Sequence, residues 1–228
     1  MFRVVTYNIR AGLGTDGVRS IRRIAEVLAS LSPDIACLQE VDQHVPRSWL
    51  ANQPKFLSAR LGMQVVFQKN VKFPTGAFGN CILAKPGVRD YHCHPLPGDG
   101  EPRGLIRATV HLDGRDVSVY CTHLSIDCDE RIVQARAIAD ILREDLSPKI
   151  LCGDMNDVMG SRTFANILED PVLVDAALEM DAGEIPTTPE SKRIDFVFPS
   201  LEFDIKSYQV VTTAASDHYP VVVDLELA

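Results

Sequence analysis

Short apolar runs alternate with amphipathic segments from the beginning of the chain. Residues 2–7 form an apolar run that ends at Asn8, and this run predicts a strand. After a glycine-rich loop, apolar residues recur at helical spacing over residues 21–31. This spacing predicts an amphipathic helix, which Ser32-Pro33-Asp34 ends.

The alternation continues to the end of the sequence. Apolar runs bounded by Gly, Pro or Asp predict strands over residues 35–38, 63–68, 80–84, 88–92, 105–112, 117–122, 149–152, 194–198, 203–211 and 221–227. Helices are expected over residues 56–61, 130–142 and 161–168, and Ser161 is expected to cap the last of them. Asp113-Gly114 predicts a tight hairpin turn.

This order of elements predicts an α/β fold. No linker or low-complexity segment divides the 228 residues, so one compact domain spanning residues 1–228 is expected. We expect two mostly antiparallel sheets, one from each half of the chain, packed face to face and covered by helices.

Composition and charge narrow the possible functions. The chain is 46% hydrophobic and 24% charged, which excludes a disordered or fibrous protein. No apolar stretch approaches the roughly 18 residues of a membrane span, and no secretion signal is recognisable, so a cytoplasmic protein is expected. A net charge of −8 gives no general attraction to nucleic acid, and no protein partner is evident.

The six cysteines do not suggest a disulfide framework. They are isolated from one another, without a Cys-x-x-Cys motif, and four lie within apolar runs that predict strands. We interpret them as reduced thiols, most of them buried.

Polar side chains lie next to the ends of the predicted strands, either just before a strand begins or just after it stops. They are Asn8, Glu40, His123, Asp154, Asn156, Asp195, Asp217 and His218. In layered α/β proteins, side chains at several strand ends converge on one rim. This set is rich in oxygen donors and has no Cys/His cage, so it favours Mg²⁺, or Mn²⁺, over zinc.

The residues around these positions resemble a known family. Thr6-Tyr7-Asn8, Leu38-Gln39-Glu40-Val41-Asp42, Thr122-His123-Leu124, Gly153-Asp154-Met155-Asn156, Arg193-Ile194-Asp195-Phe196 and Ser216-Asp217-His218-Tyr219-Pro220 are similar to motifs of the endonuclease/exonuclease/phosphatase superfamily, in that family's order. Gly79-Asn80 and Glu101-Pro102-Arg103-Gly104 resemble segments of its small bacterial hydrolases. The resemblance implies a four-layered sandwich of the deoxyribonuclease-I type and a Mg²⁺-dependent phosphodiesterase or phosphatase.

The resemblance also implies roles for individual residues. Glu40 is the chief metal ligand, with Asp217 and Asn8 nearby, while Asp154 and Asn156 hold or activate the attacking water. Asp195 orients His218, and His123 contacts the scissile phosphate. As neutral donors, the amides of Asn8 and Asn156 are also expected to hold an anionic phosphate or a water. Whether Asp154 or His218 is the general base stays open.

Two arginines and a tryptophan are weaker candidates. Arg103, and less clearly Arg107, are candidates for binding the substrate phosphate. Trp49 lies in a loop that is a candidate for lining the cleft. We expect Trp49 to pack into the core or to anchor this loop rather than to stack on a substrate base.

The substrate is predicted from size and charge. Because the chain is short and acidic, a phosphodiester in a small molecule or a phospholipid headgroup is favoured, and a DNA or RNA nuclease is the alternative. An alternative of another class is a non-catalytic binding module with the same fold. Such a module would lack an essential carboxylate or histidine, and none is missing here.

Overall fold

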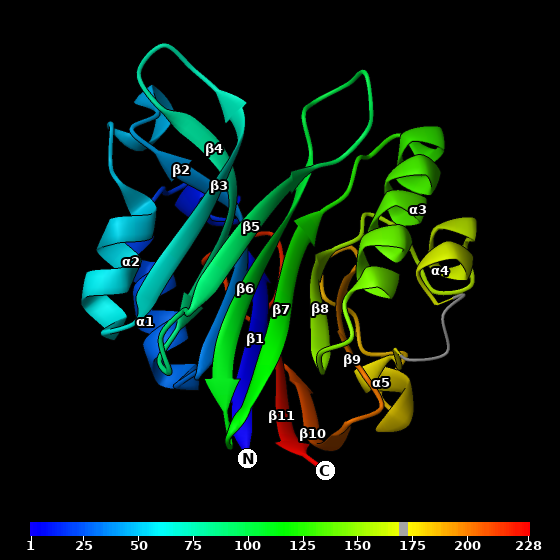
Figure 1. Cartoon of the computed structure of the whole chain (residues 1–228). Coiled ribbons are helices and arrows are strands. Elements are labelled where there is room, and N and C mark those ends of the chain that lie inside the picture. The colour runs from blue at the N-terminus through cyan, green and yellow to red at the C-terminus, as the bar shows by residue number, and fades with distance from the viewer. Residues whose placement is uncertain (169–172) are drawn as a thin grey trace.

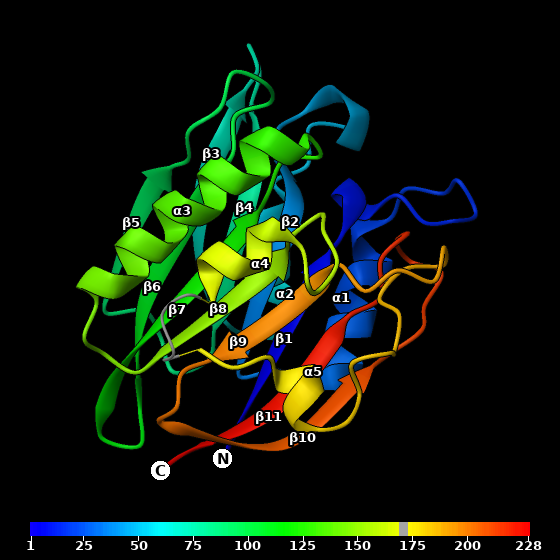
Figure 2. The ribbon, with the colours of Figure 1, turned by 90° about the vertical axis from the view of Figure 1, so that its right-hand side faces the viewer.

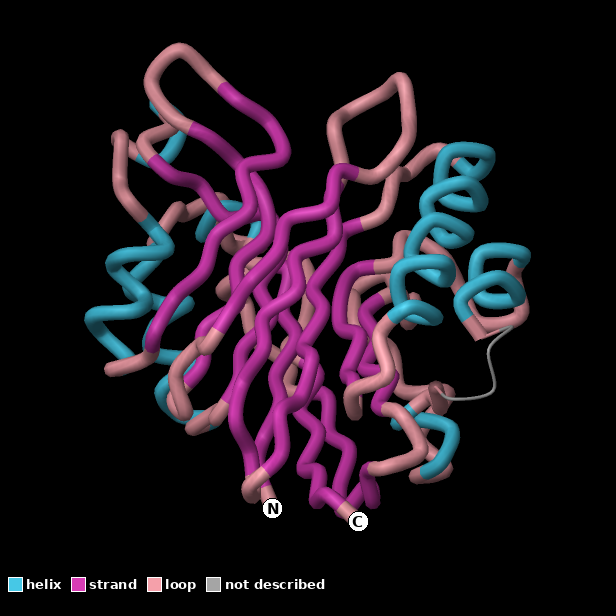
Figure 3. Tube along the Cα trace, viewed as in Figure 1, coloured by secondary structure: helices cyan, strands magenta, loops and turns pink. Residues whose placement is uncertain are grey.

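Two β-sheets pack face to face in the computed structural model, which describes residues 1–168 and 173–228 (Figures 1 and 3). The first sheet has six strands in the order β10-β11-β1-β2-β4-β3, and the second has five in the order β5-β6-β7-β8-β9. Among the described residues, nine pairs of neighbouring strands are hydrogen-bonded to each other. Two of these pairs, β1–β2 and β7–β8, are parallel. The sheets are therefore mostly antiparallel, as predicted.

The strands of the first sheet come from both ends of the chain. They are β1 (Phe2–Asn8), β2 (Ile35–Gln43), β3 (Gln64–Lys72), β4 (Ala77–Ala84), β10 (Phe203–Val210) and β11 (Val221–Leu227). The second sheet contains β5 (Asp90–Pro95), β6 (Gly104–Leu112), β7 (Arg115–His123), β8 (Lys149–Asp154) and β9 (Asp195–Pro199).

Helices cover the outer face of each sheet. Figures 1 and 2 show α1 (Ile21–Leu31) and α2 (Gln53–Leu61) on one side of the molecule, with α3 (Cys128–Glu144) and α4 (Arg162–Ile167) on the other. The short α5 (Ala176–Glu179) lies near β9 and β10, and two 3₁₀ turns, η1 (Arg10–Gly12) and η2 (Pro46–Ser48), follow β1 and β2. The result is a four-layered sandwich of helix, sheet, sheet and helix.

The central strands are apolar on both faces because each face is covered. Val4 of β1 lies in the core between the two sheets, whereas its neighbour Val5 packs on the side of α1 and α2. In the second sheet, Val119 of β7 faces the core between the sheets and Tyr120 faces α3. This double burial explains why these strands occur in the sequence as continuous apolar runs rather than as alternating patterns.

The expectation of one sheet from each half is wrong for four strands: β10 and β11 join the sheet that contains β1, and β5 and β6 of the first half join the other sheet. β11 pairs antiparallel with β1, with Phe2 opposite Leu225, and so joins the N-terminal sheet. This pairing brings the segment before β11, which contains Asp217 and His218, to the edge where β1 ends. The C-terminal hairpin thereby completes the site as well as the sheet.

Several local predictions need revision. The strand predicted over residues 88–92 is β5 at Asp90–Pro95, and the short α5 was not predicted. The helix α4 follows Ser161, but the Ser161 side chain makes no capping hydrogen bond. The predicted hairpin turn is confirmed: Asp113 and Gly114 both have positive φ between β6 and β7.

All six cysteines are free thiols. Four of them are buried in strands, where burial raises the pKa of Cys37, Cys81 and Cys121 well above its ordinary value. None of the helices in the described ranges has the length and hydropathy that a membrane crossing requires.

A buried ion pair fixes the loop that leads into β9. The guanidinium of Arg193 donates to both carboxylate oxygens of Asp175, at 3.1 and 2.8 Å, and lies 4.4 Å from the centre of the Phe196 ring. The two charged side chains are only 8% and 3% exposed. The pair connects the start of α5 to the residues that precede Asp195.

Removing one partner of this pair leaves a buried charge uncompensated. We expect Asp175→Ala to lower the free energy of unfolding, measured by urea denaturation, by about 3–5 kcal/mol. The matched control is Asp204→Ala, which breaks an exposed pair with Lys206 and is expected to cost less than about 1 kcal/mol. Equal effects of the two substitutions would contradict this account.

Candidate active site

Three side chains from both sheets meet at one edge of the sandwich. Asn8 ends β1, Glu40 lies in β2, and Asp154 ends β8. The side-chain amide of Asn8 donates to Glu40 Oε1 at 3.0 Å and to Asp154 Oδ2 at 2.9 Å. Asn8 therefore bridges a carboxylate of the first sheet to a carboxylate of the second.

Local backbone geometry places the two carboxylates. The pairing of β2 with β4 shifts register between Leu38 and Val41, and Glu40 within this irregularity has a φ of 56°. Such a bulge redirects a side chain at the end of a regular ladder, and a positive φ at a non-glycine residue is often retained at functional sites. Beside Asp154, a Cβ at Gly153 would lie 2.1 Å from the Thr122 carbonyl oxygen, so only glycine allows β8 to approach β7 there.

His218 is held by a buried carboxylate. Its Nδ1 lies 2.9 and 3.1 Å from the two carboxylate oxygens of Asp195, which is fully buried and also accepts a hydrogen bond of 2.6 Å from the Thr187 hydroxyl. The opposite ring atom, Nε2, faces Asp154 Oδ2 at 3.6 Å. Burial alone would lower the pKa of His218, but Asp195, Asp154 and Asp217 together raise it to about 10.

His123 also approaches Asp154, but its environment favours the neutral imidazole, whereas that of His218 favours the protonated form. Its Nε2 lies 3.4 Å from Asp154 Oδ2, and its side chain is almost completely buried. Burial, assisted by Arg103 and His218, lowers the pKa of His123 to about 4 despite the attraction of Asp154. One carboxylate thus lies between a protonated and a neutral imidazole at neutral pH.

The remaining predicted residues surround this centre. The Asn156 amide nitrogen donates to the Leu124 carbonyl at 2.9 Å, and its backbone N–H donates to Asp154 Oδ1 at 2.9 Å. Asp217 pairs with Arg10, whose Nη1 lies 3.1 Å from Asp217 Oδ2. Arg10 was missed in the sequence because it follows Asn8 in an irregular turn with no distinctive spacing.

A short hydrogen bond attaches the segment before β11 to β1. The Ser216 hydroxyl donates to the Asn8 carbonyl at 2.8 Å, and Ser216 is fully buried. Asp217 and His218 therefore keep their position relative to Asn8.

Two sets of residues could hold a cation. Oxygen and nitrogen atoms of Asp154, Asp195 and His218 lie within 4.8 Å of one another, but His218 and Asp195 already satisfy each other by hydrogen bonding. Glu40, by contrast, forms no ion pair with any residue of ranges 1–168 and 173–228. Burial, together with the nearby charges of Asp154 and Asp217, raises the pKa of Glu40, and the Asn8 hydrogen bond opposes this shift. A hard divalent cation beside Glu40 would relieve this repulsion, so the donor set fits Mg²⁺.

Glu40, Asp154 and His218 line a hollow of about 250 Å³, whereas Asn8, Asp195 and Asp217 are not among its lining residues. Its lining residues are Glu40, Arg47, Phe78, Glu101, Arg103, His123, Ile126, Asp154, Asn156 and His218. Arg103 therefore lines the hollow, and its contact with the substrate phosphate stays a prediction. Arg107 is not among the lining residues, because it pairs with Asp90 of the neighbouring strand β5 at 2.9 Å.

The expectation that Trp49 packs into the core or anchors its loop by burial is wrong. Trp49 directly follows η2, where its backbone has a φ of 53°, and the residue is 76% exposed. The neighbouring Arg47 lines the hollow instead, so the loop contributes a cation rather than the aromatic ring.

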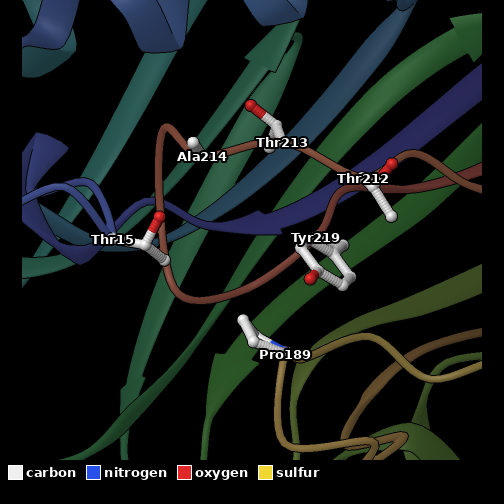
Figure 4. A pocket seen from close by; sticks show the side chains of 6 residues that line it. All are labelled: Thr15, Pro189, Thr212, Thr213, Ala214 and Tyr219. Carbon is white, nitrogen blue, oxygen red and sulfur yellow. The ribbon is translucent and has the colours of Figure 1, made fainter.

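A larger hollow of about 450 Å³ lies next to this site but does not contain its chemistry. Figure 4 shows its lining residues, Thr15, Pro189, Thr212, Thr213, Ala214 and Tyr219. Tyr219 is the only ionisable residue among these six, and none of the predicted site residues is included. The concentration of charge in the smaller hollow identifies that hollow as the candidate active site.

Comparison with known proteins identifies the family. The family model described as Endonuclease/Exonuclease/phosphatase family matches residues 5–218. The chain belongs to this family. Members of the endonuclease/exonuclease/phosphatase family are hydrolases, and the predicted fold is confirmed by structures of other members.

The relatives of this family member include proteins without an assigned activity. The uncharacterized protein YbhP of Escherichia coli (strain K12) is 27% identical, in an alignment that covers 99% of this chain and 96% of YbhP. An endonuclease/exonuclease/phosphatase from Beutenbergia cavernae is also 27% identical, with a TM-score of 0.83 over 100% of this chain and 72% of that one. The mannosyl-6-phosphatase Bt3783 of Bacteroides thetaiotaomicron has the same fold, with 20% identity and a TM-score of 0.80 over the full length of both chains.

The charge state of His218 depends on Asp195. In the metal-free protein we expect Asp195→Asn to lower the pKa of His218 from about 10 toward its ordinary value of 6.5 or below, because burial then opposes the charged form with less compensation. NMR titration of the imidazole signals measures this shift. The control, Asp90→Asn, removes an exposed partner of Arg107 and leaves the His218 titration unchanged. An unchanged titration in Asp195→Asn would contradict the assigned pairing.

Proposed function

We propose that this protein is a Mg²⁺-dependent phosphoesterase that hydrolyses a phosphodiester in a small molecule or a phospholipid headgroup. The observation that carries the proposal is the meeting of Glu40, Asn8 and Asp154 with the Asp195–His218 pair at one edge of both sheets. Metal-assisted attack of water on a phosphoester needs a carboxylate to hold the metal, a second group to position the water and donors that stabilise the phosphoryl charge. The carboxylates and the oriented imidazole of this site can supply these groups.

In this proposal Glu40 is the main ligand of Mg²⁺, which Mn²⁺ can replace, and Asp217 contributes from the segment before β11. When bound, the divalent cation neutralises charge on the phosphoryl oxygens and stabilises the leaving oxygen. Asn8 acts chiefly as a spacer: its amide nitrogen is occupied by Glu40 and Asp154, and its oxygen accepts from the Arg10 backbone N–H at 3.0 Å.

The geometry favours Asp154 over His218 as the general base. Because Nδ1 of His218 donates to Asp195 and Nε2 faces the carboxylate of Asp154, both ring nitrogens have acceptors opposite them. A doubly protonated imidazole can donate to a phosphoryl oxygen but cannot accept a proton. Asp154, fixed by hydrogen bonds from Asn8 and Asn156, orients the water and accepts its proton as the new P–O bond forms and the bond to the leaving oxygen breaks. The leaving group departs as an alkoxide and takes up a proton from the solvent.

Neutral and cationic groups complete the binding of the phosphate. His123 is neutral and Asn156 carries no charge, so both can contact an anionic oxygen without adding repulsion. Arg103, which lines the same hollow, supplies a positive charge to the phosphate. Asp195 acts through His218 by fixing its orientation.

Size and charge support a small substrate. A hollow of about 250 Å³ holds a phosphate with a short substituent, and the net charge of −8 does not attract a polyanion. A related fold is that of a mannosyl-6-phosphatase, a protein that by its name acts on a phosphorylated sugar. These points favour a small phosphoester over DNA or RNA.

Metal dependence and Glu40 test the mechanism. We expect hydrolysis of bis-p-nitrophenyl phosphate to require Mg²⁺ or Mn²⁺, to stop with EDTA, and to fall by at least about 100-fold in kcat in Glu40→Gln, because the site loses its main anionic ligand. The control Glu226→Gln removes an exposed carboxylate that pairs with Lys206 and leaves kcat unchanged. Full activity in EDTA or in Glu40→Gln would overturn the metal-dependent mechanism.

The substrate class is tested by comparing turnover of bis-p-nitrophenyl phosphate, sphingomyelin and plasmid DNA. Efficient nicking of plasmid DNA at physiological salt would reverse the preference for small or lipid phosphoesters. Absence of metal-dependent turnover on all three, with Mg²⁺ still bound, would favour the non-catalytic binding module.

A further inference from the structure

Two arginines line the active-site hollow, and the proposed chemistry gives a role to Arg103 but none to Arg47. Arg103 precedes β6, and Arg47 belongs to η2, so they come from different loops at the same hollow. Both are held in place by the fold, but each guanidinium keeps at least one N–H group without an acceptor among the described residues.

Arg103 is buried with little compensation. Its side chain is 8% exposed, its Nε is buried without a hydrogen-bond partner among the described residues, and its one ion-pair contact is to Glu101 at 3.2 Å. Glu101 is itself half exposed. Arg193 is equally buried, but both oxygens of Asp175 compensate its charge. The comparison indicates that Arg103 is placed for an anion from outside the chain rather than for stability.

The backbone that carries Arg103 is fixed from both sheets. The carbonyl oxygen of Gly104 accepts hydrogen bonds from the Asn80 amide of β4 at 2.9 Å and from the Thr122 hydroxyl of β7 at 3.1 Å. A side chain at Gly104 would displace the Gln68 amide, because a Cβ would lie 2.2 Å from Gln68 Nε2. Arg103 is therefore presented to the hollow on a preorganised backbone.

Arg47 is fixed in a different way. Its Nε and Nη2 donate to the two oxygens of Asp42 at 2.9 and 2.8 Å, and Asp42 is fully buried. The guanidinium also lies over the ring of Phe78, 4.7 Å from its centre. The remaining nitrogen, Nη1, donates to no residue in the described part of the chain, and 45% of the side chain is exposed.

We infer that Arg47 is a specificity residue whose free guanidinium edge binds a second anionic group of the substrate, next to the phosphate that Arg103 binds. The preferred substrates would then carry a phosphate or a carboxylate in addition to the phosphoester that is hydrolysed. This inference rests on the proposed function for its place in the reaction, but the binding step can be measured without turnover. A planar guanidinium that is held on one edge and open on the other suits an oxyanion.

Binding of phosphonates tests the inference. We propose to compare methylphosphonate with bisphosphonates whose two groups are separated by one to four methylenes, using calorimetry with Mg²⁺ in large excess over ligand. For the wild type, at least one bisphosphonate is expected to bind about tenfold or more tightly than methylphosphonate. In Arg47→Ala this preference is expected to disappear, while the affinity for methylphosphonate changes less than about twofold.

Two further variants separate recognition from folding. Arg47→Ala leaves Asp42 buried without its partner, so Arg47→Lys is measured beside it: lysine can still pair with Asp42 but has no second donor edge, and most of the preference is expected to be lost. Arg89→Ala, which removes an exposed arginine paired with Asp116, is the control and is expected to keep the full preference.

The outcomes distinguish the inference from the proposed function. Absence of any preference in the wild type, or an undiminished preference in both Arg47 variants, would overturn the second-anion site. A preference that depends on Arg47 without metal-dependent hydrolysis would support the anion site and refute the proposed activity. Metal-dependent hydrolysis without that preference would support the proposed activity and refute the second-anion site.

Discussion

The spacing between two carboxylates on different sheets is the constraint on which the site depends. Glu40 and Asp154 are brought to the same edge by two parallel strand pairs, β1–β2 and β7–β8, and would repel each other without an intervening group. The Asn8 amide lies between them and donates to both. A neutral amide keeps the carboxylates close without neutralising either. In the proposed mechanism their charge serves a cation and the attacking water.

The histidines extend the same arrangement. Asp195 and Asp154 keep His218 charged, whereas deep burial keeps His123 neutral, although both rings approach the same oxygen of Asp154. The site therefore places a protonated imidazole, a carboxylate and a neutral imidazole around one small hollow. Hydrogen bonds from Thr187 and Ser216 hold this combination in place through residues that do not take part in the chemistry.

Much of this organisation is predictable from the sequence, since each chemically important residue follows or precedes an apolar run. Strands β1, β6 and β8 and helices α1 and α3 correspond closely to the predicted segments because their apolar periodicity is strong. The pairing of β11 with β1 was not predictable from local pattern, because strand partners depend on contacts more than 200 residues apart in the chain. Likewise, the bulge at Glu40, the Arg10–Asp217 pair, the exposure of Trp49 and the fixed orientation of Arg47 depend on loop geometry that periodicity does not encode.

The proposed mechanism requires a hard cation beside Glu40 while the Asp195–His218 pair stays intact. Anomalous diffraction from a crystal soaked with Mn²⁺ and phosphate tests it most directly. We expect a Mn²⁺ peak about 2.0–2.3 Å from a Glu40 carboxylate oxygen, with His218 Nδ1 still hydrogen-bonded to Asp195. A peak within the Asp154–Asp195–His218 cluster, with that hydrogen bond broken and no metal at Glu40, would contradict it.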